Sequence, residues 1–69
     1  MNKIEELRKT NKLSQQELGE KVGVSQNTIS SWETEMHLPP TQKLIILSQI
    51  FNVSTDYLLG RDNTNAGTA

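Results

Sequence analysis

The chain has 69 residues, no cysteine and a formal net charge of -1. A chain this short holds one small domain, which buries only about 60% of its unfolded surface. Without cysteine, a disulfide framework and a thiolate metal site are excluded, and the cytoplasm is the expected compartment. No apolar run reaches the roughly 18 residues that a membrane span needs, so no membrane partner is expected.

The charge distribution gives only weak information about partners. A slightly acidic chain argues mildly against nucleic acid, because a strongly basic surface is the usual sign of a nucleic-acid-binding protein. Residues 1–12 are net basic, however, and residues 13–36 are net acidic. Since such runs are commonly just solvated faces, charge alone decides nothing here.

A serine preceded by an apolar residue marks several helix starts. Ser14, Ser25 and Ser54 each follow an apolar residue and precede another one four positions later. Each serine is a suitable N-cap, and each apolar pair forms a hydrophobic staple. Glu17 completes a capping box with Ser14, and Gly23 is a suitable left-handed residue to end the helix that follows.

Apolar periodicity and proline predict the other elements. Ile4 and Leu7 mark one face of an opening helix, whereas Pro39 and Pro40 interrupt the chain before a nearly all-apolar helix, LIILSQIF. That helix is expected to be central, with Ile46 or Ile50 left over for a partner. The predicted helices cover residues 2–11, 15–22, 25–34, 41–51 and 54–60. Residues 61–69 have no apolar anchor and are expected to form a flexible tail.

The second and third predicted helices are joined by a very short turn. Only Gly23 and Val24 lie between the end of the second helix and Ser25, the N-cap of the third. The chain must therefore turn sharply rather than form an antiparallel hairpin. A residue that faces such a close crossing must be small, which explains Gly19 inside a helix, where glycine costs about 1 kcal/mol relative to alanine. A helix-turn-helix unit over residues 15–34 is predicted. Its apolar cluster is expected to comprise Leu18, Val22, Val24, Ile29 and Trp32.

The run QQELGEKVGVSQNTISSWE, residues 15–33, and the later NVSTDYLLG resemble the Xre/Cro/cI-type helix-turn-helix family of phage repressors and bacterial regulators. The resemblance covers about residues 2–60. It implies an all-α, compact five-helix, lambda-repressor-like DNA-binding domain over residues 1–60, with a recognition helix at about 25–34 in the major groove. It further implies a transcriptional regulator, most simply a repressor that binds a palindromic double-stranded DNA operator as a homodimer.

Amides at the front of the predicted recognition helix are the candidate base readers. With the apolar residues of this helix turned inward, Gln26, Asn27, Ser30 and Ser31 lie outward or toward its start. An amide offers a donor and an acceptor side by side, which matches the N6 and N7 edge of adenine. Gln26 and Asn27 are therefore the leading candidates, and Ser31 is a weaker one for a base or a phosphate. The alternative is that all are ordinary polar surface residues.

Phosphate contacts are expected at helix starts. Free N–H groups and the helix dipole favour an anion at the start of the helix that begins at residue 15. Gln15 lies there, and the family resemblance implies a phosphate contact for it. The other candidates for phosphate contact are Thr28, Ser30, Gln42 and Lys43.

Arg8, Glu33 and Trp32 are first considered as structural, and His37 as a possible metal ligand. The resemblance implies that Arg8 and Glu33 pair internally and tie the recognition helix to the first helix, and the alternative is a free Arg8 that contacts phosphate. Trp32 is expected in the core, with its indole N–H needing a partner. His37 has no second histidine, cysteine or patterned carboxylate near it, so neither a metal nor another cofactor is expected.

Residues 34–40 depart from the family pattern, which often has a glycine and basic residues there. Met36 and Leu38 are expected to be exposed, which leaves a second reading open: an antitoxin-like or repressor-binding protein-interaction module that uses Met36, Leu38 or the helix at 41–51. A core role is the favoured prediction for most of a further apolar set, with dimer contact as the alternative: Leu58, Leu59, Ile46 and Ile50. No nucleophile is paired with a base, so no enzymatic activity is expected.

Overall fold

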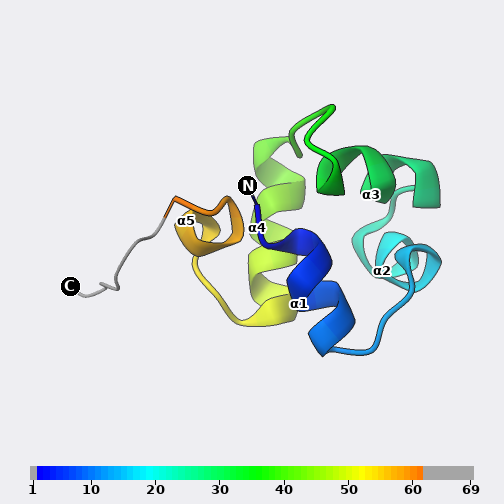
Figure 1. Cartoon of the computed structure of the whole chain (residues 1–69), viewed down its shortest axis with the longest axis horizontal. Coiled ribbons are helices and arrows are strands. Elements are labelled where there is room, and N and C mark those ends of the chain that lie inside the picture. The colour runs from blue at the N-terminus through cyan, green and yellow to red at the C-terminus, as the bar shows by residue number, and fades with distance from the viewer. Residues whose placement is uncertain (1, 62–69) are drawn as a thin grey trace.

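A computed structural model describes residues 2–61 of the chain. Its helices are α1 (Ile4–Thr10), α2 (Gln15–Val22), α3 (Gln26–Glu33), α4 (Thr41–Phe51) and α5 (Thr55–Leu58). In Figure 1, α4 runs through the middle of the molecule, between α5 on one side and α2 and α3 on the other. No strand occurs between residues 2 and 61, and the predicted all-α, five-helix class is confirmed.

The predicted serine caps begin α2, α3 and α5. The hydroxyls of Ser14, Ser25 and Ser54 accept hydrogen bonds at 3.0, 3.1 and 3.0 Å from the backbone N–H three positions later. At α2 the capping box is complete, because the Glu17 carboxylate accepts the Ser14 backbone N–H at 2.8 Å. Each such cap contributes about 0.5–2 kcal/mol. Three of the five helix starts are therefore determined locally.

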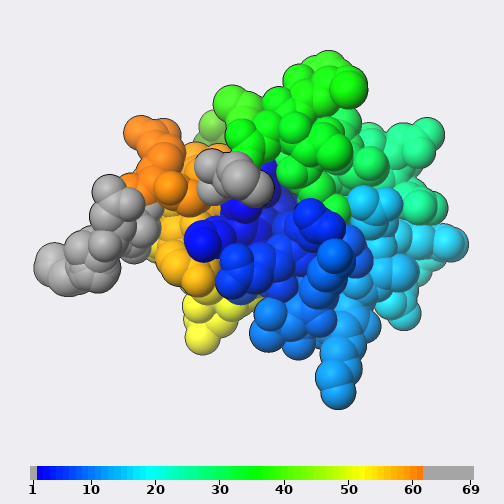
Figure 2. Space-filling model, viewed as in Figure 1, coloured from blue at the N-terminus to red at the C-terminus, as the bar shows by residue number. Residues whose placement is uncertain are grey.

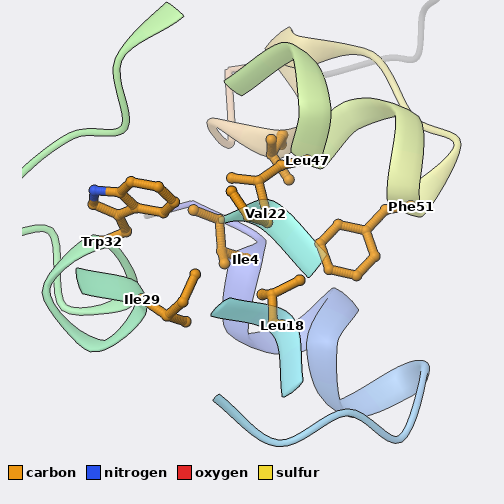
Figure 3. Close-up of a cluster of buried hydrophobic side chains, with 8 residues drawn as sticks. Ile4, Leu18, Val22, Ile29, Trp32, Leu47 and Phe51 are labelled. Carbon is orange, nitrogen blue, oxygen red and sulfur yellow. The ribbon is translucent and has the colours of Figure 1, made fainter. Parts of the chain in front are cut away.

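The core draws side chains from all five helices. Trp32 and Phe51 lie at opposite ends of the cluster, with aliphatic side chains between them (Figure 3). The staple residues Leu13, Val24 and Val53 are partly buried and pack against it. Complete burial of one such side chain contributes about 1.5–3 kcal/mol. The buried core residues are Ile4, Leu18, Val22, Ile29, Trp32, Leu47, Phe51 and Leu58.

Gly19 allows α2 and α3 to cross at close range. A Cβ at this position would lie 2.6 Å from the carbonyl oxygen of Val24 and 3.3 Å from backbone atoms of Ser25. Gly23 ends α2 in the left-handed conformation, with φ at 88°, and its N–H donates to the Gly19 carbonyl at 2.7 Å. The two glycines thus set both the sharpness of the turn and the separation of the helices.

The prediction that Ile46 or Ile50 of α4 is left over for a partner is wrong, and the core role favoured for most of the candidate dimer contacts is confirmed for both residues. Ile46 and Ile50 are partly buried and pack against the core, whereas Ile45 is 45% exposed. Ile45 precedes the buried Leu47 by two positions, about 200° around the helix, and so points away from the core. Leu58 is fully buried and cannot contact a second copy, and Leu59 is only partly exposed.

The first helix is shorter than predicted, because Asn2 lies outside it. The Asn2 side chain accepts the Ile4 N–H at 3.1 Å through Oδ1, and it donates through Nδ2 to the carbonyl of Trp32 at 2.8 Å. This residue therefore joins the start of α1 to the end of α3. At the other end, Arg61 is exposed and its N–H donates to the Asp56 carbonyl at 2.9 Å.

The rest of the predicted tail, residues 62–69, lies outside the described residues. None of the helices found between residues 2 and 61 has the length and apolar character needed to cross a membrane.

Replacing Gly19 with alanine tests the close crossing. We expect Gly19→Ala to lower the free energy of unfolding by about 2 kcal/mol net, because the clash with backbone atoms outweighs the roughly 1 kcal/mol gain in helix propensity. Urea denaturation measures the change, with Glu20→Ala on the exposed side of the same helix as the control. A variant more stable than wild type would contradict the crossing as described.

Candidate nucleic-acid interface

Helix α3 has one apolar face and one polar face. Ile29 and Trp32 are buried, and the 3.6-residue period places Asn27 and Ser31 on the opposite side. Gln26 and Asn27 are exposed, whereas Ser31 is partly buried. The two amides therefore stand on the outside of the helix-turn-helix unit, as their proposed role requires, and base contact by them stays a prediction.

The two amides differ in their surroundings. Gln26 lies on the flank of α3 that faces the start of α2, where its Nε2 donates to Oε1 of Gln15 at 3.5 Å. Asn27 lies closer to the centre of the outward face, and its side chain has no hydrogen-bond partner within residues 2–61. Gln26 is thus partly oriented before any ligand binds, and Asn27 is not.

Behind Gln15 lies a buried ion pair. Arg8 donates through Nε to Oε2 of Glu33 at 2.6 Å and through Nη2 to Oε1 at 3.3 Å, while Nη1 donates to the Leu13 carbonyl at 2.8 Å. The side chains of Arg8 and Glu33 are only 10% and 4% exposed. Gln15 donates through Nε2 to Glu33 Oε1 at 3.0 Å. Arg8 is therefore an internal partner of Glu33, and the alternative of a free phosphate contact is wrong.

The ion pair fixes the charge of Arg8. Its hydrogen bond with Glu33 raises the pKa of the guanidinium, and burial acts in the opposite direction. Since the net shift is upward from an already high value, Arg8 keeps its charge wherever the protein is folded. Among the described residues no buried side-chain nitrogen or oxygen lacks a hydrogen-bond partner.

Several predicted phosphate contacts already have partners in the free protein. Thr28 Oγ1 lies 2.9 Å from Ser25 Oγ, and the Ser31 hydroxyl donates to the Thr28 carbonyl at 3.0 Å. Lys43 donates through Nζ to the Val22 carbonyl at 3.2 Å, and so caps the C-terminal end of α2. A lysine has three donors, so this bond leaves others for a ligand. Contact with DNA by any of these residues stays a prediction.

The other candidates differ in exposure. Gln42 is exposed in the first turn of α4, and Ser30 is partly buried. Thr34, which follows α3 directly, is exposed and its hydroxyl donates to the Ser30 carbonyl at 3.1 Å. Thr34 lies one turn beyond Ser30 on the same side of the helix and was not among the contacts predicted from the sequence. Its spacing of four residues from Ser30 was the available signal.

The outward face of α3 carries no charged side chain, whereas α2 has the exposed Glu17, Glu20 and Lys21. Helix α3 has no acidic residue in its first turn and no basic residue in its last turn. The Glu33 charge is paired with Arg8. Lys43 is thus the one charged side chain among the candidate contacts named above. Polar hydrogen-bonding groups, rather than a basic patch, characterise this surface.

The segment between α3 and α4 protrudes from the molecule. Figure 2 shows it at the upper edge of the space-filling view. Met36 is 74% exposed and Leu38 is 68% exposed, as expected from the sequence, whereas Pro39 is buried. Glu35 adopts a positive φ of 65° and accepts the Asn2 N–H at 2.8 Å. The protruding tip is therefore apolar, and its base is tied to the start of the chain.

Comparison with known sequences decides the family. The sequence pattern described as "Helix-turn-helix" matches residues 4–58. The chain belongs to the helix-turn-helix family. The resemblance to Xre/Cro/cI-type regulators is confirmed by this match and by the structural likeness to the P22 c2 repressor given next.

Three similar proteins illustrate the helix-turn-helix relatives. The P22 c2 repressor, whose crystal structure holds a synthetic operator, superimposes with a TM-score of 0.81 at 42% identity, over 87% of this chain and 91% of that one. YobD of Bacillus subtilis (strain 168), an uncharacterized HTH-type transcriptional regulator, is 40% identical over 58 residues, which are 84% of this chain and 52% of YobD. Antitoxin PezA of Streptococcus pneumoniae serotype 4 is 39% identical over 59 residues, 86% of this chain and 37% of PezA.

The present chain therefore spans about half or less of the length of these curated relatives.

A double-mutant cycle tests the buried ion pair. We expect Arg8→Met and Glu33→Leu each to lower the free energy of unfolding by about 3–5 kcal/mol, because each leaves an unpaired buried charge. The double variant should lose much less than the sum, as measured by urea denaturation. The same cycle on the exposed Lys9–Glu5 pair, 2.9 Å apart, should show far weaker coupling because water screens it. Additive losses for Arg8 and Glu33 would contradict their pairing.

Proposed function

We propose that the chain is the DNA-binding part of a transcriptional regulator that recognises a specific double-stranded sequence. In this proposal α3 enters the major groove, which is about 12 Å wide and admits one helix. Gln26 and Asn27 read base edges, Ser31 supports them, and the start of α2 meets the phosphate backbone. The observation that carries the proposal is the pair of exposed amides on a short helix whose other face is entirely committed to the core.

The contacts to the backbone follow from the helix ends. The start of α2 presents free N–H groups and the positive end of the helix dipole, next to the second N–H of Gln15. Gln42 and Lys43 lie in the first turn of α4 and are assigned to phosphate on the other side of α3. Thr28 and Ser30 complete the assigned set. These contacts orient α3 in the groove but carry little sequence information.

Repression through a homodimer is the specific form that we propose. The P22 c2 repressor, the structural relative above, is described in complex with an operator. One domain of this size offers few charged contacts, so two copies on half-sites about 34 Å apart would raise affinity and explain a palindromic operator. Because the proposed partner of this chain is DNA, we propose the cytoplasm as its location. No catalytic role is assigned to any residue.

A protein-interaction module is the second candidate function. It is favoured by Met36 and Leu38, which are both exposed on the protruding segment, since large apolar side chains exposed together commonly mark a binding surface. Ile45 is a further exposed apolar side chain, on α4. Similarity to an antitoxin, PezA, supports the same reading. Under this alternative, selection from random duplex DNA would enrich no sequence, while a second protein would bind tightly.

Truncating Gln26 tests base reading. We expect Gln26→Ala to weaken binding to a duplex selected from random DNA by about 1–3 kcal/mol, and to weaken binding to unselected DNA far less. Fluorescence anisotropy titrations at one fixed salt concentration give both values. Gln49→Ala, an exposed glutamine in the later half of α4, is the matched control and should bind like wild type. Equal losses on both DNAs would make Gln26 a backbone contact.

Removing the charge of Lys43 tests the phosphate assignment. Each basic side chain that neutralises a phosphate contributes about 0.9 to the slope of log K against log salt concentration. We expect Lys43→Gln to make this slope shallower by about 1. Lys9→Gln, which removes an exposed charge paired with Glu5 on α1, should leave the slope unchanged. An unchanged slope for Lys43→Gln would remove Lys43 from the interface.

A further inference from the structure

The geometry points to Glu33 as a positioning residue that sets the direction of the base-reading amide of Gln26 and thereby its preference among bases. Glu33 does not face the proposed groove, and its carboxylate is 4% exposed. It acts through Gln15, which links it to Gln26. This assignment rests on the proposed DNA-binding function and deepens it.

The first step concerns Gln15, whose amide can point in two directions. A carboxylate without a proton only accepts hydrogen bonds, so the side of Gln15 that faces Glu33 must be its NH2 group. The observed contact is Nε2 to Oε1 of Glu33 at 3.0 Å. The carbonyl Oε1 of Gln15 must then face the other way, toward the start of α3.

The second step passes this direction to Gln26. Because Oε1 of Gln15 can only accept, Gln26 must approach it with its own NH2 group, and Nε2 lies 3.5 Å away. The second N–H and the carbonyl oxygen of Gln26 remain available outward, in a fixed order along the helix. Adenine presents an acceptor at N7 and a donor at N6 in a fixed order, whereas guanine presents two acceptors. A free amide can match adenine by rotating, but it can also turn its NH2 group toward the two acceptors of guanine. A Gln26 amide held in this orientation cannot, so it disfavours guanine relative to adenine.

The third step is the rigidity of Glu33 itself. Arg8 holds both of its oxygens, at 2.6 and 3.3 Å, and is in turn fixed by the Leu13 carbonyl at 2.8 Å. Helices α1, α2 and α3 thus contribute one residue or more each to a single chain of hydrogen bonds that runs from the interior to the recognition surface. The Nε and Nη2 donors of Arg8 and the amide donors of Gln15 and Gln26 point toward Glu33, whereas Nη1 of Arg8 donates to the Leu13 carbonyl.

The decisive variant is Glu33→Gln, which keeps the shape of the side chain. Its amide both donates and accepts, so the Gln15 amide can bond to it in either orientation and no direction is passed on. Glu17→Gln is the matched control, because it also removes a carboxylate that accepts a hydrogen bond in the same part of the molecule, yet has no link to Gln26. Urea denaturation and circular dichroism establish that each variant is folded.

The first measurement needs no DNA. In wild type and Glu17→Gln, NMR relaxation should show the side-chain amides of Gln15 and Gln26 to be ordered. In Glu33→Gln the order parameters of both should fall below about 0.6. Amides that are equally ordered in Glu33→Gln would overturn the assignment.

The second measurement is the base preference on the selected duplex. At the position where Gln26→Ala abolishes discrimination, adenine is replaced by guanine. Wild type and Glu17→Gln should each lose about tenfold in affinity on this replacement, whereas Glu33→Gln should lose less than about threefold. If Glu33→Gln does not fold, Gln15→Leu, which leaves the Arg8–Glu33 pair intact, should show the same small ratio.

The outcomes separate the two proposals. A wild-type chain that enriches no sequence would overturn the proposed function, and the base-reading role of Glu33 with it. A wild-type chain that selects a sequence while the folded Glu33→Gln or Gln15→Leu variant keeps the full preference for adenine would overturn the positioning role alone.

Discussion

The close approach of α2 to α3 is the constraint on which the rest of the molecule depends. Without a side chain at Gly19, the Val24 carbonyl can lie against α2 where a Cβ would be only 2.6 Å away. This approach brings Ile29 and Trp32 into the core and turns the other side of α3 outward. It also brings the end of α3 close enough to the start of α2 for Glu33 to bond Gln15. The packing of the core and the arrangement of the polar surface therefore have one common cause.

The polar groups of this small domain are organised from the inside outward. A buried Arg8–Glu33 pair is a costly feature unless every donor and acceptor is satisfied, and here the Leu13 carbonyl and the Gln15 amide complete it. The same carboxylate that ties α1 to α3 reaches the residues proposed to meet DNA. In such an arrangement, the stability of the fold and the orientation of the surface amides depend on the same bonds.

The outward face of α3 that results carries no charged side chain, so it has no basic patch. Hydrogen-bonding groups with defined directions favour selectivity among sequences, whereas charge mainly raises affinity for any sequence. The exposed Met36 and Leu38 lie on a separate, protruding segment. The two kinds of surface are therefore distinct.

The sequence by itself determined the features that depend on near neighbours along the chain. Serine caps, the staples, the left-handed Gly23 and the exposure of Gln26 and Asn27 follow from bonds and periodicities spanning a few residues. Only the tertiary structure decided which isoleucine of α4 is exposed, that Lys43 caps α2, and that Gln15 lies between Glu33 and Gln26. These contacts join residues from 11 to 21 positions apart, and their existence depends on helix crossing angles that no local pattern specifies.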